Sequence, residues 1–239
     1  MADTDNTSEL TREVKNQLDG MIVGIELTLI SIVQGLALSV LASSAVQPLT
    51  QLQVEYWPAI IVGALAILIF WSRSLIHTLS FIGWPLEFGH NFIYFVSTLI
   101  EVTFLTQISN PPAWFALQCV YFAIAWFLYF YDLRVVYKHH HDFQTPSERK
   151  LYDDIVADQL LNVRFLMPAG VAFNLLAWWL IQQRPDLFIE RQWHVGLSLM
   201  SVLVGVIYLW DGMIILKRRQ HWIVARYIQE RREALETEE

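Results

Sequence analysis

Six stretches of mostly apolar residues constrain the fold of this chain more than any other feature of its sequence. A hydrocarbon layer about 30 Å thick requires about 20 apolar residues in helical form, because lipid offers no partner to a backbone N–H or C=O group. The stretches that reach or approach this length are residues 20–45, 57–81, 91–107, 114–131, 164–182 and 193–216. They predict an all-α, polytopic membrane protein with six transmembrane helices.

Composition agrees with lipid as the main solvent. Apolar residues make up 55% of the chain and charged residues 16%, against roughly 25% charge in soluble domains. The formal charge of −7 implies no nucleic-acid partner, because much of the acid lies in the polar ends of the chain. Cys119 is the only cysteine, which excludes an intramolecular disulfide and a cysteine-rich metal site. We expect a multi-pass protein of a cell (plasma or inner) membrane.

Basic residues orient the predicted helices, because Lys and Arg near helix ends are retained on the cytoplasmic side. With the N-terminus inside, only Arg184 and Arg191 of the 16 Lys and Arg residues fall outside. This asymmetry favours six helices, both termini in the cytoplasm, and basic residues against anionic headgroups. The second stretch is the weakest, since its purely apolar part ends near Trp71, and a count of five helices remains an alternative.

Aromatic rings are expected at the two headgroup levels, where one side of the ring meets lipid and the other water. The outer group is Trp57, Trp114, Trp178, Trp179 and Trp193, and the inner group is Trp71, Trp84, Tyr131, Tyr137 and Trp210.

The chain divides into a cytoplasmic amphipathic segment, a six-helix transmembrane domain and a cytoplasmic C-terminal helix, at residues 1–19, 20–216 and 217–239. In the first segment, apolar residues recur every four positions, as in an amphipathic helix, at Leu10, Val14 and Leu18. We expect this helix to lead directly into the first span.

A further cytoplasmic helix is expected at about residues 146–163, inside the loop after the fourth span. Thr145 and Glu148 match the N-cap and N3 positions of a capping box, and Pro146 suits N1. This helix would carry an acidic face through Asp153, Asp154 and Asp158.

Ionisable residues within a span are costly and mark functional or assembly sites. In the first span, Asp19 and Glu26 are seven residues apart and share a face. In the third, a single face would carry Glu87, His90, Tyr94, Ser97 and Glu101, at spacings of three and four. Such a stripe fits a hydrated path for cations or protons, or else a polar seam in which Glu101 is protonated or hydrogen-bonded to Thr, Gln or Asn.

Opposite charges at similar depth near the inner boundary predict ion pairs. They are Arg73, Asp132, Arg134, Arg164 and Asp211, with His77 at the same level. Pro168 removes a backbone donor within the fifth span, so a kink is expected there and a hinge is one interpretation.

The run of His139, His140 and His141 admits two interpretations. Imidazole is a common ligand of zinc, copper and nickel, but adjacent helical side chains point about 100° apart, so a pH-sensitive basic collar against anionic headgroups is the alternative. No catalytic motif of the GxSxG, HExxH, phosphate-loop or GxGxxG type occurs. We therefore expect neither an enzyme nor a bound cofactor.

In layout, the first three helices resemble the six-helix potassium channels of endolysosomes and bacteria that carry an Arg/Phe-Ser-Asp signature. The residues that carry the resemblance are Asp19 with Gly20, Thr28, Trp71, His77 and Asn91. The signature itself is not matched, because Gln17 and Leu18 precede Asp19. The resemblance concerns topology, and no residue role is carried over from it.

Two functions fit these features best, and a weaker third is a lipid-handling or membrane-embedded enzyme that uses the inner-face histidines and carboxylates. The first is an oligomeric channel or transporter for cations or protons, based on the carboxylate stripes and the Pro168 kink. The second is a non-catalytic structural or assembly subunit of a larger membrane complex, in which amphipathic helices bind partners.

Overall fold

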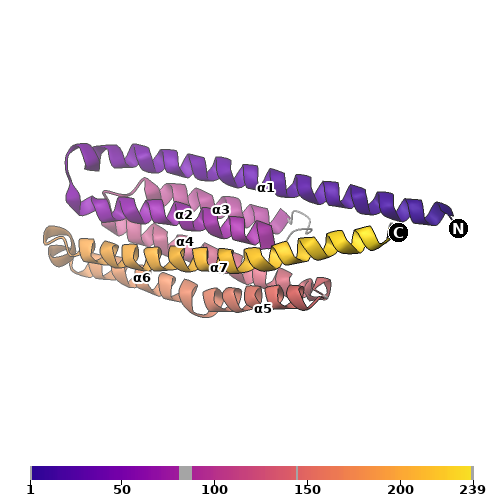
Figure 1. Cartoon of the computed structure of the whole chain (residues 1–239). Coiled ribbons are helices and arrows are strands. Elements are labelled where there is room, and N and C mark those ends of the chain that lie inside the picture. Colours follow the sequence, from indigo (N-terminus) through magenta and orange to yellow (C-terminus); the bar gives the residue numbers. More distant parts are fainter. Residues whose placement is uncertain (1, 81–87, 144, 238–239) are drawn as a thin grey trace.

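The computed structural model describes residues 2–80, 88–143 and 145–237. Its described elements are all helical, and they lie side by side in an elongated bundle with both ends of the chain at the same end (Figure 1). We refer to this as the terminal end of the bundle. The helices are α1 (Ala2–Thr50), α2 (Trp57–Ser80), α3 (Phe88–Leu105), α4 (Pro111–Lys138), α5 (Pro146–Leu161), α6 (Met167–Gln183) and α7 (His194–Thr237).

Within the described residues, five helical segments are long and apolar enough to cross a membrane. They are Leu27–Thr50, Val54–Thr78, Pro111–Lys138, Glu148–Gln183 and His194–Trp222. The expectation of an all-helical chain with several such segments is confirmed. The expectation that the second stretch would be the weakest is wrong: the short apolar segment is Phe92–Leu105 in α3. Helix α2 continues past Trp71 because its polar residues Arg73 and His77 pair with carboxylates inside the bundle.

The three segments expected to form helices outside the membrane are helical, and their position relative to a membrane remains a prediction. Helix α1 runs without a break from Ala2 to Thr50, and α7 continues to Thr237. The capping box of α5 is confirmed: Thr145 Oγ1 accepts from the Glu148 N–H at 3.3 Å, and the Glu148 carboxylate accepts from the Thr145 N–H at 2.8 Å.

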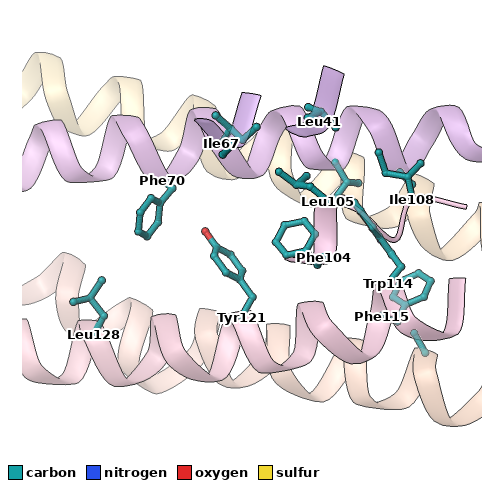
Figure 2. Packing of buried hydrophobic residues seen from close by; sticks show 14 of the residues in the cluster. Leu41, Ile67, Phe70, Phe104, Leu105, Ile108, Trp114, Phe115, Tyr121 and Leu128 are labelled. Atoms are coloured by element: carbon teal, nitrogen blue, oxygen red, sulfur yellow. The ribbon is translucent and has the colours of Figure 1, made fainter. Parts of the chain in front are cut away.

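The main apolar core lies among α1, α2, α3 and α4, with contributions from α6. Figure 2 shows Tyr121 of α4 pointing toward α2, near Phe70 and Phe104. The Phe104 ring meets Trp114 edge-on, with 5.1 Å between ring centroids. Trp114 is only 1% exposed, so this ring packs in the core, and its expected place at the outer headgroup level remains a prediction.

Helices α4 and α6 approach each other closely along their length. A Cβ atom on Gly170 would overlap the ring of Phe122, so a glycine is needed where these two helices meet. One turn away, Cys119 Sγ lies 3.7 Å from the Val171 carbonyl oxygen, which is consistent with Cys119 acting as a small packing residue.

Helices α5 and α6 are joined by a π-helical turn, Asn162–Leu166, directly before Pro168. The Met167 N–H donates to the Asn162 carbonyl. In an α-helix it would donate to the Val163 carbonyl, which therefore lacks this donor. The next possible main-chain donor is residue 168, a proline, which has no N–H. The indole N–H of Trp126 on α4 donates to the Val163 carbonyl instead, at 2.8 Å.

This turn gives the expected kink a physical cause. Figure 1 shows the change of direction between α5 and α6. A π-turn with a side-chain donor inserted into the backbone ladder is one of the recognised causes of a bend. That Pro168 acts as a hinge remains a prediction.

Replacing Trp126 with Phe should destabilise the protein by about 1–3 kcal/mol, the cost of leaving the half-buried Val163 carbonyl without a donor. In a Pro168→Ala background the cost should be smaller, because the alanine restores a main-chain N–H near Val163. Thermal unfolding in detergent, followed by circular dichroism, measures both. Trp179→Phe is the matched control, since Trp179 is exposed on α6 and its indole bonds to no described residue. Equal costs for Trp126→Phe in the two backgrounds would contradict this account.

Candidate functional site

A cavity of about 380 Å³ lies inside the bundle and is lined by residues of α1 to α7. We call it the central cavity. Most of its wall is apolar, but polar and charged side chains line it toward the terminal end, among them Arg73, His77, Asp132 and Asp158. Gln118 and Asn174 line it farther from that end.

Asp158 is the centre of a charged network at this end of the cavity. It is 9% exposed, and its two carboxylate oxygens each accept from Arg73 Nη1 at 3.0 Å. Arg219 Nη2 donates to the same carboxylate at 3.1 Å. A carboxylate buried to this degree is tolerated because two guanidinium groups replace its hydration.

The network continues outward from Asp158. Arg219 Nε donates to Asp154 at 2.9 Å, and Arg218 also pairs with Asp154. Arg73 Nη2 lies 3.5 Å from Asp211. We call these six residues the arginine–aspartate network: Arg73, Asp154, Asp158, Asp211, Arg218 and Arg219. It joins α2, α5 and α7, so the expected loop helix α5 is held against the bundle by charge.

A chain of neutral hydrogen bonds extends the network into the bundle. Asn162 Nδ2 donates to the Asp158 carboxylate at 3.2 Å and to its carbonyl at 2.8 Å. Tyr208 donates its hydroxyl hydrogen to Asn162 Oδ1 at 2.6 Å. Since that hydrogen is used, Tyr129 must donate in the 2.9 Å contact between the two tyrosine hydroxyls. The Arg73 guanidinium also lies over the Tyr208 ring, 4.4 Å from its centroid.

The expected inner-face ion pairs are found in part. Arg73 and Asp211 lie together as expected, and Asp132 lies beside His77, with 3.7 Å between Oδ2 and Nδ1. Arg134 and Arg164 are exposed and form no ion pair with a described residue.

The sequence did not indicate the partners at the centre of the network. Asp154 and Asp158 lie on the predicted acidic face of this helix, but their cationic partners are 61 to 85 residues away in the chain. The one available signal was the four-residue spacing of the two aspartates on a predicted helix near a basic segment.

Glu101 lies on the inward face of α3, away from the charged network. It is fully buried, as is Ser97, and Tyr94 is 4% exposed, so these three residues of the predicted stripe share the interior face. Gln34 of α1 donates to Glu101 Oε2 at 3.3 Å. Glu101 Oε1 has no hydrogen-bond partner among the described residues. This contact matches the polar-seam interpretation, while the unpaired oxygen leaves a site for a proton or cation.

The structure does not describe the side chains of the other residues in the two predicted polar stripes. Glu87 lies outside the described residues. Asp19 and Glu26 belong to α1 and His90 belongs to α3, but their side chains also lie outside the description.

The histidine run follows α4, with His139 at its C-cap and His140 and His141 in a short 3₁₀ turn. His139 Nδ1 lies 3.0 Å from the Val135 carbonyl oxygen, and the His140 ring lies 5.6 Å from that of Tyr152. Among the described residues, no three His, Cys, Asp or Glu side chains are grouped so that they could hold a metal ion. The geometry therefore gives no support to the metal-site interpretation of these histidines.

Comparison of the chain with protein-family models, with curated proteins and with solved structures finds no match. The roles of the residues around the central cavity therefore follow from their geometry and chemistry.

Replacing Asp158 with Asn should destabilise the protein by about 3–5 kcal/mol, because Arg73 and Arg219 would keep buried charges with one counter-ion fewer. Asp153→Asn is the matched control: Asp153 is exposed on the same helix and forms no ion pair with a described residue. Thermal unfolding of the two variants in the same detergent compares them. Similar midpoints for both variants would show that the network does not hold α5 in place.

Proposed function

We propose that this chain is a membrane transport protein that carries protons or cations through the central cavity. The observation that carries the proposal is Glu101, which is fully buried within an apolar helix and has no cationic partner among the described residues. Carboxyl groups in such positions are rare because they are costly, and where they occur they commonly bind an ion or relay a proton.

The surroundings of Glu101 support a link to the cavity. Tyr94 and Tyr121 both line the cavity, and both lie close enough to Glu101 to feel its charge. At the terminal end, the His77–Asp132 pair also lines the cavity. Titratable side chains thus line the cavity at two depths, as a path for protons or cations requires, and Glu101, which does not itself line the cavity, lies near Tyr94 and Tyr121.

Six spans with both termini inside are part of the proposal. Helix α3 has 18 residues and is about 27 Å long at 1.5 Å per residue, close to the thickness of the hydrocarbon layer. Counted as a crossing, it makes six with the five longer segments. The buried face of α3 carries Glu101, and its apolar stretch, Phe92–Leu105, is shorter than the other five.

An assembly subunit is the second candidate, and the exposure of α7 favours it. Of the apolar window of α7, 11% is buried inside the chain, against 33% for α2 and for α4. Its exposed residues include Leu203, Val204, Ile207 and Trp210. Such a face requires lipid, a second copy of the chain or another membrane protein.

Glu101→Gln should reduce the flux of the transported ion at least about tenfold, because the amide can neither bind a proton nor neutralise a cation. The assay uses purified protein in liposomes, with a pH-sensitive dye for protons and imposed sodium or potassium gradients. Glu190→Gln is the control, since Glu190 is exposed between α6 and α7. Unchanged flux in Glu101→Gln would overturn the assignment of Glu101. No flux of any of these ions in the unmodified protein would favour the assembly role.

Orientation can be tested with single cysteines in a Cys119→Ala background. Lys150 and Arg191 are exposed at opposite ends of the bundle. Six spans with the N-terminus inside predict that Lys150→Cys is protected from an impermeant maleimide in intact cells and that Arg191→Cys is labelled. Labelling of Lys150→Cys from outside would reject this orientation.

A further inference from the structure

The size of the central cavity suggests a guest larger than an inorganic ion. Its volume of about 380 Å³ falls within the range of small-molecule sites, roughly 300–1,000 Å³. A bare metal ion or proton would leave most of this space empty. The cavity therefore fits an organic molecule with a substantial apolar part.

Aromatic rings make up much of the cavity wall. They include Phe70, Tyr94, Phe104, Tyr121, Phe122 and Tyr129. Phe70 and Tyr94 lie 4.8 Å apart between ring centroids, and Phe104 and Tyr121 lie 5.4 Å apart. The faces of such rings attract organic cations, an interaction that strengthens when water is excluded.

The cationic side chains of the wall are already engaged. Arg73 is held by Asp158 and Asp211, and Arg219 by Asp154 and Asp158. Arg73 Nη2 lies 3.5 Å from Asp211 and forms no hydrogen bond within the described residues. An anionic guest would still have to compete with three carboxylates for the guanidinium groups, so the network disfavours anions.

Two amide side chains of the wall instead offer unused acceptors. Asn174 is 2% exposed and Gln159 is 6% exposed, and the oxygen of each amide has no hydrogen-bond partner among the described residues. The orientation of Asn174 is fixed, because its Nδ2 donates to the Gly170 carbonyl at 2.8 Å. Buried acceptors without partners are costly, and a guest that donates hydrogen bonds would satisfy them.

We infer that the central cavity binds an organic ammonium ion with an apolar, preferably aromatic, body. The ammonium group would donate to the amide oxygen of Asn174, which lies away from the arginine–aspartate network, and the apolar part would lie against the aromatic wall. This inference rests on the proposed function and names the class of cation that the cavity holds.

The test measures binding to the purified full chain in detergent, by isothermal titration, for three ligands of similar size. They are 2-phenylethylammonium, the neutral 2-phenylethanol and the anion 3-phenylpropanoate. The ammonium ion should bind most tightly. Equal or tighter binding of the alcohol or the carboxylate would overturn the inference, as would no binding of the ammonium ion.

The residue assignment is tested with Asn174→Leu, which removes the acceptor but keeps the side-chain size. It should weaken ammonium binding about tenfold, the loss expected for one hydrogen bond to a charged group. Gln183→Met is the control, because Gln183 is exposed at the end of α6 and lies away from the cavity. Unchanged affinity in Asn174→Leu would overturn the assignment.

Ala66→Leu provides a second test that touches no polar group. Ala66 lines the cavity, and the larger side chain should exclude the ligand and abolish binding, while the unfolding temperature without ligand stays close to that of the unmodified chain. Full binding in this variant would place the ligand elsewhere.

Binding and flux separate the two proposals. If protons or inorganic cations cross the membrane in a Glu101-dependent way but no ammonium ion binds, the inference fails and the proposed function stands. If the ammonium ion binds but neither it nor any tested ion is transported, the cavity is a ligand site and the transport proposal fails.

Discussion

The buried carboxylate of Asp158 is the interaction on which the arrangement of the helices at the terminal end depends. A carboxylate at this depth is stable because Arg73 of α2 and Arg219 of α7 supply charged hydrogen bonds and Asn162 adds a neutral one. Those same bonds fix α5 against the bundle and line one end of the central cavity. The network also affects the chemistry of the cavity, because its guanidinium groups are already paired with three aspartates, which disfavours an anionic guest.

A second constraint lies where α5 passes into α6. Pro168 and the π-turn together remove the main-chain donor of the Val163 carbonyl, and Trp126 supplies one from α4. The bend is therefore stabilised by a neighbouring helix. It lets a single 36-residue helical segment serve both as the support for Asp158 and as the wall that carries Asn174.

The inner part of the candidate site could be anticipated only in outline. The spacing of Tyr94, Ser97 and Glu101 placed them on one face, and the structure buries that face. The sequence did not indicate which residue would contact Glu101, because its partner Gln34 is 67 residues away in the chain. The sequence also did not indicate that the amide oxygens of Gln159 and Asn174 lack hydrogen-bond partners. Whether such an oxygen is paired depends on the donors that neighbouring helices place beside it.

The sequence by itself determined the helical class, the long apolar segments and the local signals, such as the capping box at Thr145 and the kink at Pro168. These depend on composition and on neighbours within a few residues. Tertiary structure alone decided that α2 continues through Arg73, that Trp114 lies in the core, and that Asp158 binds two arginines. The physical reason is that the cost of burying a charge or the gain from burying a ring depends on groups brought from distant parts of the chain.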